Sequence, residues 1–452
     1  MKPRERADQI CQTLRANGHQ AFLAGGCVRD LLLGREPADF DVATDAVPAR
    51  VQELFPNSNA VGAQFGVILV VDDGTHTEVA TFRSDVSYSD GRHPDAVVYS
   101  RTPQEDVQRR DFTINGLLID PQTGEILDYV GGRADLEAKV VRAIGEPSRR
   151  FSEDKLRMMR AVRFAARLGY AIEPGTADAI RKHADEITQV SAERQRDELA
   201  KILTEGAARR GFELLDELGL LAAVLPEITR MKGVAQPPQF HPEGDVWIHT
   251  RLMLEGLAPG CSPTLAWGVL FHDVGKPPTF APPVDSGRIR FDGHVEVGAR
   301  MAEEICRRLR FPNDDTSQIV LLVENHLRFK DVSEMRASTL KRFVRLPRFE
   351  EHLELHRLDC SSSHRNLEAY EYVSRFLKET PHEQVRPPRI LTGDDLRGLG
   401  FTPGPVYKEI LRVVEDAQLE GRLKDTQGAV EFVRKNFKLA PSLPGVKNGT
   451  TP

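Results

Sequence analysis

Cysteine is scarce in this chain and shows no metal-binding or disulfide pattern. The five cysteines among 452 residues are scattered, odd in number and never spaced as Cys-x-x-Cys. These features argue against a disulfide framework and against a zinc ribbon. They favour reduced thiols, and we therefore expect a cytoplasmic location.

Long apolar segments are also missing. No apolar run reaches the length that a membrane-spanning helix requires, and residues 1–6 lack the apolar core of a signal peptide. We therefore expect no interaction with a membrane.

An excess of positive charge is missing as well. The formal net charge is −6, so any contact with nucleic acid has to come from a local basic patch. Residues 149–210 hold 14 Arg and Lys against 10 Asp and Glu, a local balance of +4. This stretch is either an RNA-binding surface or an ordinary solvated helical surface, and charge alone does not decide between them.

The pattern of apolar residues predicts an α+β fold with a mixed first part and a helical remainder. Pro-rich segments at 234–244 and 381–388 mark boundaries between units. The expected units are 1–145, which is α/β, 146–233 and 246–378, which are helical, a helical tail at 389–440 and a disordered end at 441–452.

Individual elements follow from local patterns. Ser152 is expected to cap the first helix of the helical part, with Phe151 and Leu156 as a hydrophobic staple. Residues 83–97 are expected to form a polar loop. The expected strands are 21–24, 40–43, 65–71, 77–82 and 117–119, and the expected helices of the first part are 4–16, 28–34 and 47–55.

Gly25-Gly26 and Asp39-Phe40-Asp41 form the most informative part of the chain. A glycine turn between a strand and a helix lets backbone N–H groups approach phosphate oxygens. In a strand, Asp39 and Asp41 would share one face, and paired carboxylates suit Mg²⁺. Alone, the glycines are compatible with a simple turn and the carboxylates with a solvated loop. Their close order in the sequence favours nucleotidyl transfer.

Further segments follow this one in a recognisable order. They are Arg109-Arg110-Asp111-Phe112-Thr113-Ile114-Asn115, Asp128-Tyr129-Val130-Gly131-Gly132, Glu153-Asp154 with Arg157, Arg160 and Arg163, and a looser Glu193-Arg194 with Glu198. Together they resemble the class II tRNA nucleotidyltransferase and bacterial poly(A) polymerase family, which is part of the DNA polymerase β-like superfamily. The resemblance covers about residues 15–230.

The resemblance implies a fold and a set of roles. It implies a polymerase β-like nucleotidyltransferase head at 1–145 and a helical nucleotide- and tRNA-binding neck and body at 146–233. Asp39 and Asp41 would bind Mg²⁺ and carry the catalysis. Glu78 is a candidate third carboxylate, although a strand Glu facing water explains it equally well. The implied nucleotide-binding residues are Gly25, Gly26, Arg29, Arg110, Asp111, Asp154, Arg157, Arg160 and Arg163.

Asp154 and Arg157 match the family's base-reading pair. A carboxylate accepts a hydrogen bond from an exocyclic amine, and a guanidinium donates to a ring nitrogen or carbonyl oxygen. Cytosine and adenine present that combination, whereas guanine and uracil present the reverse. The loop at 84–96 occupies the place of the family's switching loop, and its full length favours competence to add A.

A second set of residues has the chemistry of a metal site. His249, the pair His272-Asp273 followed by Gly275-Lys276, and Asp359 resemble the HD phosphohydrolase superfamily and would bind one ion. His294 and His326 would bind a second ion or contact phosphate. Imidazole with carboxylate suits Mn²⁺, Ni²⁺, Fe²⁺ or Mg²⁺. The plainer alternative is a structural helical domain without hydrolytic activity.

The sequence therefore predicts an enzyme that builds the 3′-terminal CCA of tRNA from ATP and CTP, with a fused HD domain at 246–378. An A-only-adding enzyme and a poly(A) polymerase share the same motifs and stay open as alternatives. A phosphohydrolase with a non-catalytic RNA-binding N-terminal domain and a non-enzymatic RNA-binding regulator are less favoured, because both sets of metal-binding residues are intact. The expected partners are the tRNA 3′ end, ATP and CTP, and the oligomeric state is open.

Overall fold

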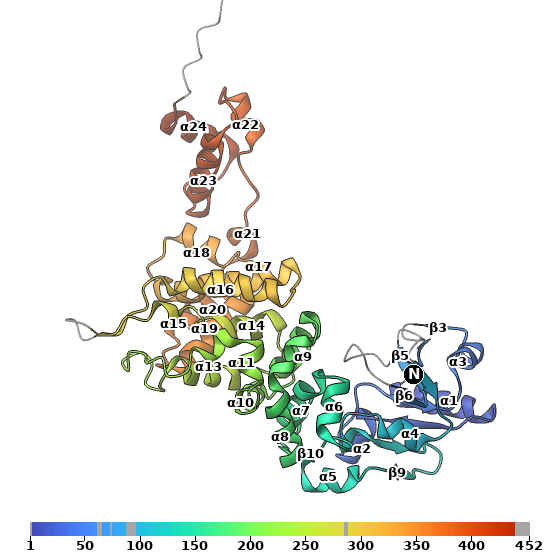
Figure 1. Cartoon of the computed structure of the whole chain (residues 1–452). Coiled ribbons are helices and arrows are strands. Elements are labelled where there is room, and N and C mark those ends of the chain that lie inside the picture. Colours follow the sequence, from blue (N-terminus) through green and yellow to red (C-terminus); the bar gives the residue numbers. More distant parts are fainter. Residues whose placement is uncertain (1, 61–65, 73–74, 87–95, 284–287, 439–452) are drawn as a thin grey trace, which may run out of the picture.

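The chain folds into an elongated series of units. The computed structural model describes residues 2–60, 66–72, 75–86, 96–283 and 288–438. A head (residues 2–145) lies at one end, a helical body (146–233) joins it to a third region (246–378), and the helices of the tail (389–438) lie at the other end (Figure 1). The expected disordered end at 441–452 lies outside the described residues.

A mixed sheet forms the frame of the head. Its strand order is β3-β4-β5-β2-β1-β8-β9, in which β2 pairs antiparallel with β1 and parallel with β5. Because β1 and β2 are buried in the middle of the sheet, their apolar side chains supply both faces. The strands are β1 (Ala21–Ala24), β2 (Asp41–Thr44), β3 (Ser58–Asn59), β4 (Val67–Asp72), β5 (Thr75–Thr81), β8 (Leu117–Ile119) and β9 (Ile126–Asp128).

The prediction of a polar loop at 83–97 is wrong at both ends of that range, where the structure has strands. β6 (Arg83–Val86) and β7 (Ala96–Tyr99) pair antiparallel, with Arg83 opposite Tyr99 and Val86 opposite Ala96. Residues 87–95, the middle of the proposed switching loop, lie outside the described residues.

Helices cover the sheet and hold the glycine turn in place. Gly25 follows the last residue of β1 and is the N-cap of α2. It has φ +78°, a left-handed conformation that glycine adopts without strain. A Cβ at Gly25 would lie 2.9 Å from Nη1 of Arg110, so the turn is also closely packed. The helices of the head are α1 (Pro3–Ala16), α2 (Gly26–Leu32), α3 (Pro48–Leu54), α4 (Pro103–Gln108) and α5 (Gly132–Ala138).

The body begins with a broken helix whose cap was predicted wrongly. Glu146 caps α6 by accepting hydrogen bonds from the N–H groups of Ser148 and Arg149. Ser152 lies inside α6 and donates to the carbonyl of Arg149. A short parallel pair, β10 (Val140–Val141) and β11 (Ala171–Ile172), ties the head to the body. The body helices are α6 (Pro147–Glu153), α7 (Leu156–Leu168), α8 (Pro174–His183), α9 (Ala192–Thr204), α10 (Ala208–Glu217), α11 (Leu220–Val224) and α12 (Pro226–Thr229).

One apolar core runs from the head through the body into the third region. It includes Ile10 of α1, Phe212 of α10 and Leu358 of α19, whereas Phe329 and Phe343 belong to a separate cluster. The helices of the third region are α13 (Val246–Glu255), α14 (Pro263–Phe271), α15 (Lys276–Thr279), α16 (His294–Arg308), α17 (Asn313–Asn325), α18 (Ala337–Phe343), α19 (Phe349–Ser362) and α20 (Glu368–Glu379).

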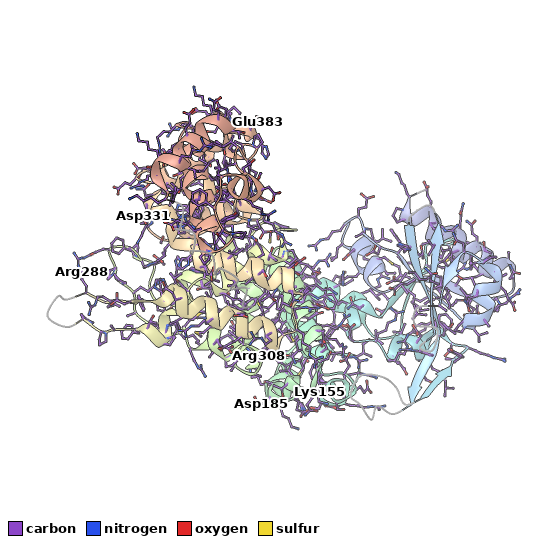
Figure 2. All side chains as sticks on the ribbon, turned by 90° about the horizontal axis from the view of Figure 1, so that it is seen from above. Lys155, Asp185, Arg288, Arg308, Asp331 and Glu383 are labelled. Carbon is purple, nitrogen blue, oxygen red and sulfur yellow. The ribbon has the colours of Figure 1, made fainter. Side chains whose placement is uncertain are left out.

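The tail has a core of its own. Leu396, Ile410 and Val433 are buried together in a cluster separate from those before it. Seen from above, Lys155 and Asp185 lie on the body and Glu383 lies with the C-terminal helices (Figure 2). The remaining helices are α21 (His382–Val385), α22 (Gly393–Gly398), α23 (Pro405–Leu419) and α24 (Thr426–Asn436). Within the described ranges, every helix is too short or too polar to cross a lipid bilayer.

Candidate active site and candidate metal centre

The carboxylates of the head lie where β2 begins. Phe40 is buried while Asp39 is exposed and Asp41 half-buried, so the side chains alternate as the sequence predicted. Parallel pairing places Val42 opposite Val79, which brings Glu78 of β5 next to Asp41. Burial, followed by the negative charge of Glu78, raises the pKa of Asp41 to about 6. Carboxylates gathered in this way, one of them desolvated, fit a divalent cation.

An arginine-rich cavity of about 420 Å³ opens beside Asp41 between the head and the body. The head contributes the glycine turn, and α7 and α9 close the cavity from the body. Six arginines and three aspartates line it, so its charge suits a polyanion such as a triphosphate. The lining residues are Gly25, Gly26, Arg29, Asp41, Arg109, Arg110, Asp111, Asn115, Asp154, Leu156, Arg157, Arg160, Phe164 and Arg194.

Asp111 connects the head to the body across this cavity. Its Oδ2 accepts hydrogen bonds from Nε and Nη2 of Arg160 at 2.9 and 2.7 Å, and its Oδ1 accepts from Asn115. Although burial opposes ionisation, the Arg160 charge outweighs it and lowers the pKa of Asp111 to about 2. Asn115 also accepts from Nη1 of buried Arg29 at 2.7 Å. Arg29 and Arg160 are therefore held in fixed positions.

Asp154 lies between α6 and α7, Arg157 lies in the first turn of α7, and both line the cavity. Oδ2 of Asp154 accepts a hydrogen bond from Nη2 of Arg194 at 2.8 Å. Nη1 of Arg157 donates to Glu153 at 2.8 Å, and its Nη2 donates to the carbonyl of Arg109 at 3.0 Å. The two side chains are thus fixed by neighbours on three different segments.

Arg163 is not brought into the cavity. Its guanidinium is buried, donates to Glu198 of α9 at 2.6 Å and lies 4.4 Å from the centre of the Phe164 ring. Arg29 and Arg160 lie over the same ring at 5.2 and 5.3 Å. Asn115, Phe164 and Arg194 also line the cavity; they belong to the motif segments but were not predicted as site residues.

Three histidines of the third region share one arrangement. His272 follows α14, His294 begins α16 and His326 follows α17. Each Nδ1 lies 2.7–2.8 Å from the backbone carbonyl three residues earlier, namely that of Val269, Phe291 or Val323. Each Nε2 is buried and has no hydrogen-bond partner. Imidazoles held in this way present Nε2 lone pairs, as metal-binding histidines do.

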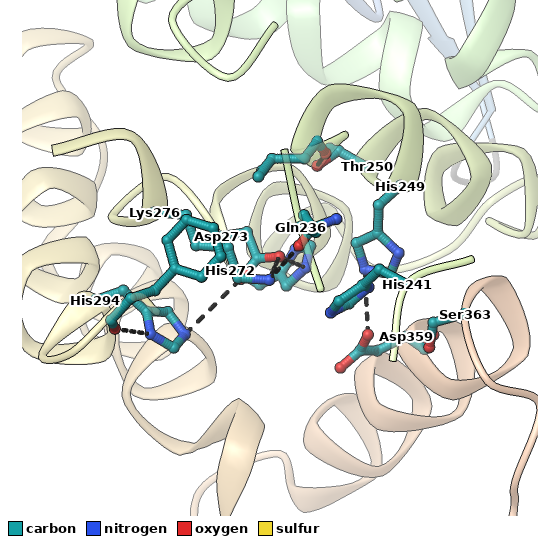
Figure 3. A network of polar contacts seen from close by, with 12 residues as sticks. Gln236, His241, His249, Thr250, His272, Asp273, Lys276, His294, Asp359 and Ser363 are labelled. Atoms are coloured by element: carbon teal, nitrogen blue, oxygen red, sulfur yellow. Dashed lines mark hydrogen bonds and ion pairs between the residues drawn. The ribbon is translucent and has the colours of Figure 1, made fainter. Parts of the chain in front are cut away.

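Asp273 lies at the centre of these histidines. Its Oδ1 is 4.0 Å from Nε2 of His294 and 3.9 Å from Nε2 of His326, and its Oδ2 is 3.1 Å from Nε2 of His272. Despite burial, the charges of His272 and Lys276 keep the pKa of Asp273 well below its usual range. Lys276 lies 2.7 Å from Asp273, and its ammonium donates to Gln236 at 2.6 Å (Figure 3).

His249 and Asp359 complete the set. Nε2 of His249 lies 3.2 Å from Oδ1 of Asp359, which faces it from α19 (Figure 3). Burial opposes protonation of His249, but contacts with Asp359 and Glu243 outweigh burial and raise its pKa to about 9. Burial lowers the pKa of His326 to about 4. The six predicted residues are thus brought together, and their unpartnered nitrogens and carboxylates fit a divalent transition metal.

His241 and Glu243 also lie at this site, although they were not among the residues predicted from the sequence. Their side chains lie against His249, with Glu243 Oε1 at 2.7 Å from Nδ1 of His249 and 2.9 Å from Nδ1 of His241. The signal for them in the sequence is a histidine and a carboxylate shortly before His249, within the Pro-rich segment 234–244 that marks a boundary.

Comparisons with known proteins match three successive parts of the chain. Residues 21–142 match the poly(A) polymerase head domain, residues 169–232 the probable RNA- and SrmB-binding site of polymerase A, and residues 245–357 the HD domain. These matches coincide with the carboxylate cluster, with part of the body and with the histidine cluster.

The chain is also similar in sequence to curated CCA-adding enzymes. The CCA-adding enzyme of Geobacillus stearothermophilus is 44% identical over 220 residues, which are 49% of this chain and 54% of the relative. That of Latilactobacillus sakei subsp. sakei (strain 23K) is 38% identical over 269 residues, covering 58% of this chain and 66% of the relative. The chain thus spans about half to two thirds of the length of these curated relatives.

A solved structure matches over nearly the whole length. The Bacillus stearothermophilus CCA-adding enzyme in complex with CTP has a TM-score of 0.73 and 27% identity, covering 96% of this chain and 99% of that chain. The similarity therefore includes the arrangement of the head and the helical regions. The chain belongs to the class II tRNA nucleotidyltransferase and bacterial poly(A) polymerase family, as a member with a fused HD domain.

Proposed function

We propose that this chain is a tRNA nucleotidyltransferase that adds or repairs the 3′-terminal CCA of tRNA, using CTP and ATP and no nucleic-acid template. The observation that carries the proposal is one cavity shared by Asp41, the arginines beside the glycine turn and the pair Asp154 and Arg157. The CCA-adding activity of the relatives and the CTP in the related structure support it.

The residues of the cavity divide the work of nucleotidyl transfer. Asp39 and Asp41, with Glu78 as candidate third carboxylate, would hold Mg²⁺. The bound ion supplies a Lewis acid for the attacking 3′-hydroxyl and the α-phosphate and neutralises the departing pyrophosphate. Gly25, Gly26 and Arg29 would hold the triphosphate. Arg110, Asp111 and Arg160 would hold phosphate or ribose.

Asp154 and Arg157 would choose the base. The carboxylate oxygens of Asp154 accept from Arg194 and from the N–H of Leu156, and each keeps a second lone pair that can accept from an exocyclic amine. Arg157 is fixed at 2.8 Å from Glu153. A rigid acceptor beside a rigid donor matches cytosine and adenine and leaves guanine and uracil with mismatched groups. Arg163, which is tied to Glu198, would support the wall of the cavity instead of touching the nucleotide.

Nucleotide addition by the purified protein tests the proposal. We would incubate it with tRNAs that end before, within and after CCA, and offer ATP, CTP, GTP or UTP singly. CCA addition predicts C on the shortest tRNA, A on the tRNA ending in CC and no product on the complete end. Addition of A alone would identify an A-adding enzyme, and long A-tails would identify a poly(A) polymerase. No addition to any end would overturn the proposal and leave the phosphohydrolase with an RNA-binding head as the alternative.

The third region is proposed as a metal-dependent phosphohydrolase. The observation that favours this second activity is the set of buried, unpartnered Nε2 atoms around Asp273. His249, His272, Asp273 and Asp359 would hold a divalent metal such as Mn²⁺, Ni²⁺, Fe²⁺ or Mg²⁺, and His294 and His326 would hold a second ion or a phosphate. The bound ion would polarise a phosphoester and activate water. The proposed substrates are 2′,3′-cyclic phosphates or phosphomonoesters at damaged RNA ends.

The proposed division into domains follows the two sites. We assign residues 1–145 to the nucleotidyltransferase head, 146–233 to the neck and body, 246–378 to the HD domain and 389–440 to a helical tail. The five cysteines are free thiols, which supports a cytoplasmic location alongside the tRNA substrate.

A further inference from the structure

His249 differs from the other histidines of the metal centre in what holds its ring. His272, His294 and His326 each place Nδ1 against the backbone carbonyl three residues earlier. For His249 that carbonyl belongs to Val246, and it accepts a hydrogen bond from Oγ1 of Thr250 at 2.8 Å. His249 therefore needs another group to hold its ring.

Glu243 supplies that group. Its Oε1 lies 2.7 Å from Nδ1 of His249, and the two side chains are 8% and 0% exposed. The opposite ring atom, Nε2, faces Asp359 and the centre of the site. A carboxylate behind a metal-binding imidazole orients the ring, selects its tautomer and raises its basicity as a ligand.

The local fold is built to place this carboxylate. The N–H of Gly244 donates to the carbonyl of His241 at 3.4 Å, which closes a turn over Pro242 and Glu243. Gly244 itself has φ +135°, and a Cβ there would lie 2.9 Å from Cδ1 of Ile248. Asp245 then caps α13 by accepting from the N–H of Ile248 at 2.7 Å, and its other oxygen accepts from the N–H of Gly233. The turn folds Glu243 back over the first turn of α13, where His249 lies.

We propose that Glu243 is a positioning residue that orients His249 toward the metal centre. This inference rests on the proposed HD metal site and deepens it. His241 contacts the same Oε1 at 2.9 Å and lies edge-on to the His249 ring at 4.8 Å, where it supports Glu243.

The rival explanation is a separate metal site made of His241, Glu243 and His249, whose ligand atoms are close enough for one ion. That site would use Nδ1 of His249. A neutral imidazole has one acceptor nitrogen, so His249 cannot serve both this site and the centre beside Asp359 without losing both ring protons. The positioning role leaves Nε2 as the ligand and Nδ1 as the donor to Glu243.

Metal binding by the full chain tests the inference. Metal-free wild type, Glu243→Ala, Glu243→Gln and His241→Ala would be titrated with Ni²⁺ alone, and the bound Ni²⁺ measured by calorimetry and elemental analysis. Glu243→Ala should weaken Ni²⁺ binding by about 10- to 100-fold with unchanged stoichiometry at saturation. Glu243→Gln should lose less, because its amide oxygen still accepts from Nδ1–H, and His241→Ala should change affinity by less than about threefold.

Each other result overturns the inference in an identifiable way. Equal affinity of Glu243→Ala and wild type would remove the positioning role while leaving the metal site in place. Loss of one equivalent of Ni²⁺ in both Glu243→Ala and His241→Ala would show the separate metal site instead. Wild type that binds no Ni²⁺ would overturn the proposed HD metal site together with the inference. The visible spectrum of the Co²⁺-loaded forms supplies a second readout, because a positioning residue leaves the number of ligands unchanged.

Discussion

At the scale of the residue, both sites depend on side chains held by specific neighbours. Asp111 is locked by Arg160 and Asn115, and Asp273 is surrounded by imidazoles and Lys276. Such groups are expensive to bury without partners, so ligands are expected at the buried Nε2 atoms that make no hydrogen bond. A cation is expected beside Asp41, whose pKa is raised by burial and by Glu78. Single substitutions there should change chemistry more than stability.

The first prediction concerns Asp39 and Asp41. The double variant Asp39→Ala/Asp41→Ala should lower the rate of nucleotide addition by more than about 100-fold. Loss of the metal-binding carboxylates should raise the activation free energy by several kcal/mol, and each ~1.4 kcal/mol lowers the rate about tenfold. Binding of tRNA should be nearly unchanged. Rates of addition and tRNA affinity measure the two effects. Asp178→Ala, which removes an exposed carboxylate on α8, is the matched control and should leave the rate unchanged. If the double variant keeps more than about a tenth of the wild-type activity, the assignment is wrong.

The second prediction concerns base choice. Asp154→Ala or Arg157→Ala should raise incorporation of GTP or UTP relative to CTP and ATP, because half of the discriminating pair is lost. Arg194→Ala removes the partner of Asp154 but neither reading group, so it should change the rate and keep the selectivity. Competition between pairs of nucleotides measures the ratio. Unchanged selectivity with a lower rate in both pair variants would show that Asp154 and Arg157 are structural.

At the scale of the element, a buried histidine links pH to the packing of α19. His356 stacks on Phe329 at 4.3 Å with the rings nearly parallel, inside a cluster that includes Phe343 and Phe349. Its side chain is buried, its ring nitrogens lie 3.6–3.7 Å from Sγ of Cys360, and the nearby Asp359 carboxylate offsets only part of the effect of burial. Burial lowers the pKa of His356 to about 4. The folded state therefore prefers the neutral ring.

The third prediction follows from the sign of that shift. A histidine with a lowered folded pKa contributes stability that is fully present above the unfolded pKa, near 6.5, and is lost as the pH falls toward 4. Between pH 7.5 and 5, His356 should cost the wild type about 2 kcal/mol. His356→Phe keeps the stack and should remove that part of the loss.

The measurement uses the chain's own fluorescence. Both tryptophans, Trp247 and Trp267, are buried in the third region, so urea unfolding followed by tryptophan emission reports on it. The free energy of unfolding is compared between the two pH values within each variant, so the effect of the larger phenylalanine ring on packing cancels. The prediction is wrong if His356→Phe and wild type lose the same free energy of unfolding between the two pH values.

At the scale of the whole molecule, two sites of different chemistry share one chain. The cavity beside Asp41 is lined by residues of the head and body, whereas the histidine cluster is built from α13 to α19 and the segment before them. One apolar core connects the two parts. The proposed substrates of the second site are blocked RNA ends. Water that opens a 2′,3′-cyclic phosphate to a 2′-phosphate, or that removes a 3′-phosphate as inorganic phosphate, would free the 3′-hydroxyl that the first site needs.

The fourth prediction separates the two activities. His272→Ala/Asp273→Ala should abolish metal-dependent hydrolysis of 2′,3′-cyclic phosphate ends and keep nucleotide addition to intact tRNA. Asp39→Ala/Asp41→Ala should do the reverse. Both activities would be assayed with Mn²⁺, Ni²⁺ or Mg²⁺ supplied, alongside analysis of bound metal. Wild type with neither hydrolysis nor bound metal would favour a purely structural third region.

Local order was readable from the sequence because it depends on near neighbours. The turn at Gly25-Gly26, the alternation of Asp39, Phe40 and Asp41 and the helical character of the second half follow from backbone freedom and apolar period. Most element positions in the head were right within a few residues. The cap of α6 and the pair β6 and β7 were predicted wrongly, because the outcome there depends on which of several local partners is chosen. The short elements β3, β9, α4 and α5 were not predicted.

Only the tertiary structure decided which distant groups meet. Parallel pairing of β2 with β5 places Glu78 beside Asp41. Packing of α9 on α7 lets Arg194 donate a hydrogen bond to Asp154, and it lets Arg163 donate to Glu198 instead of lining the cavity. The fold also brings Asp359 to His249 across more than a hundred residues. The sequence by itself determined the family and the kinds of ligand atoms available, because residue types and spacing carry that information. Which of those atoms face a common centre is a matter of long-range packing, and spacing along the chain does not contain it.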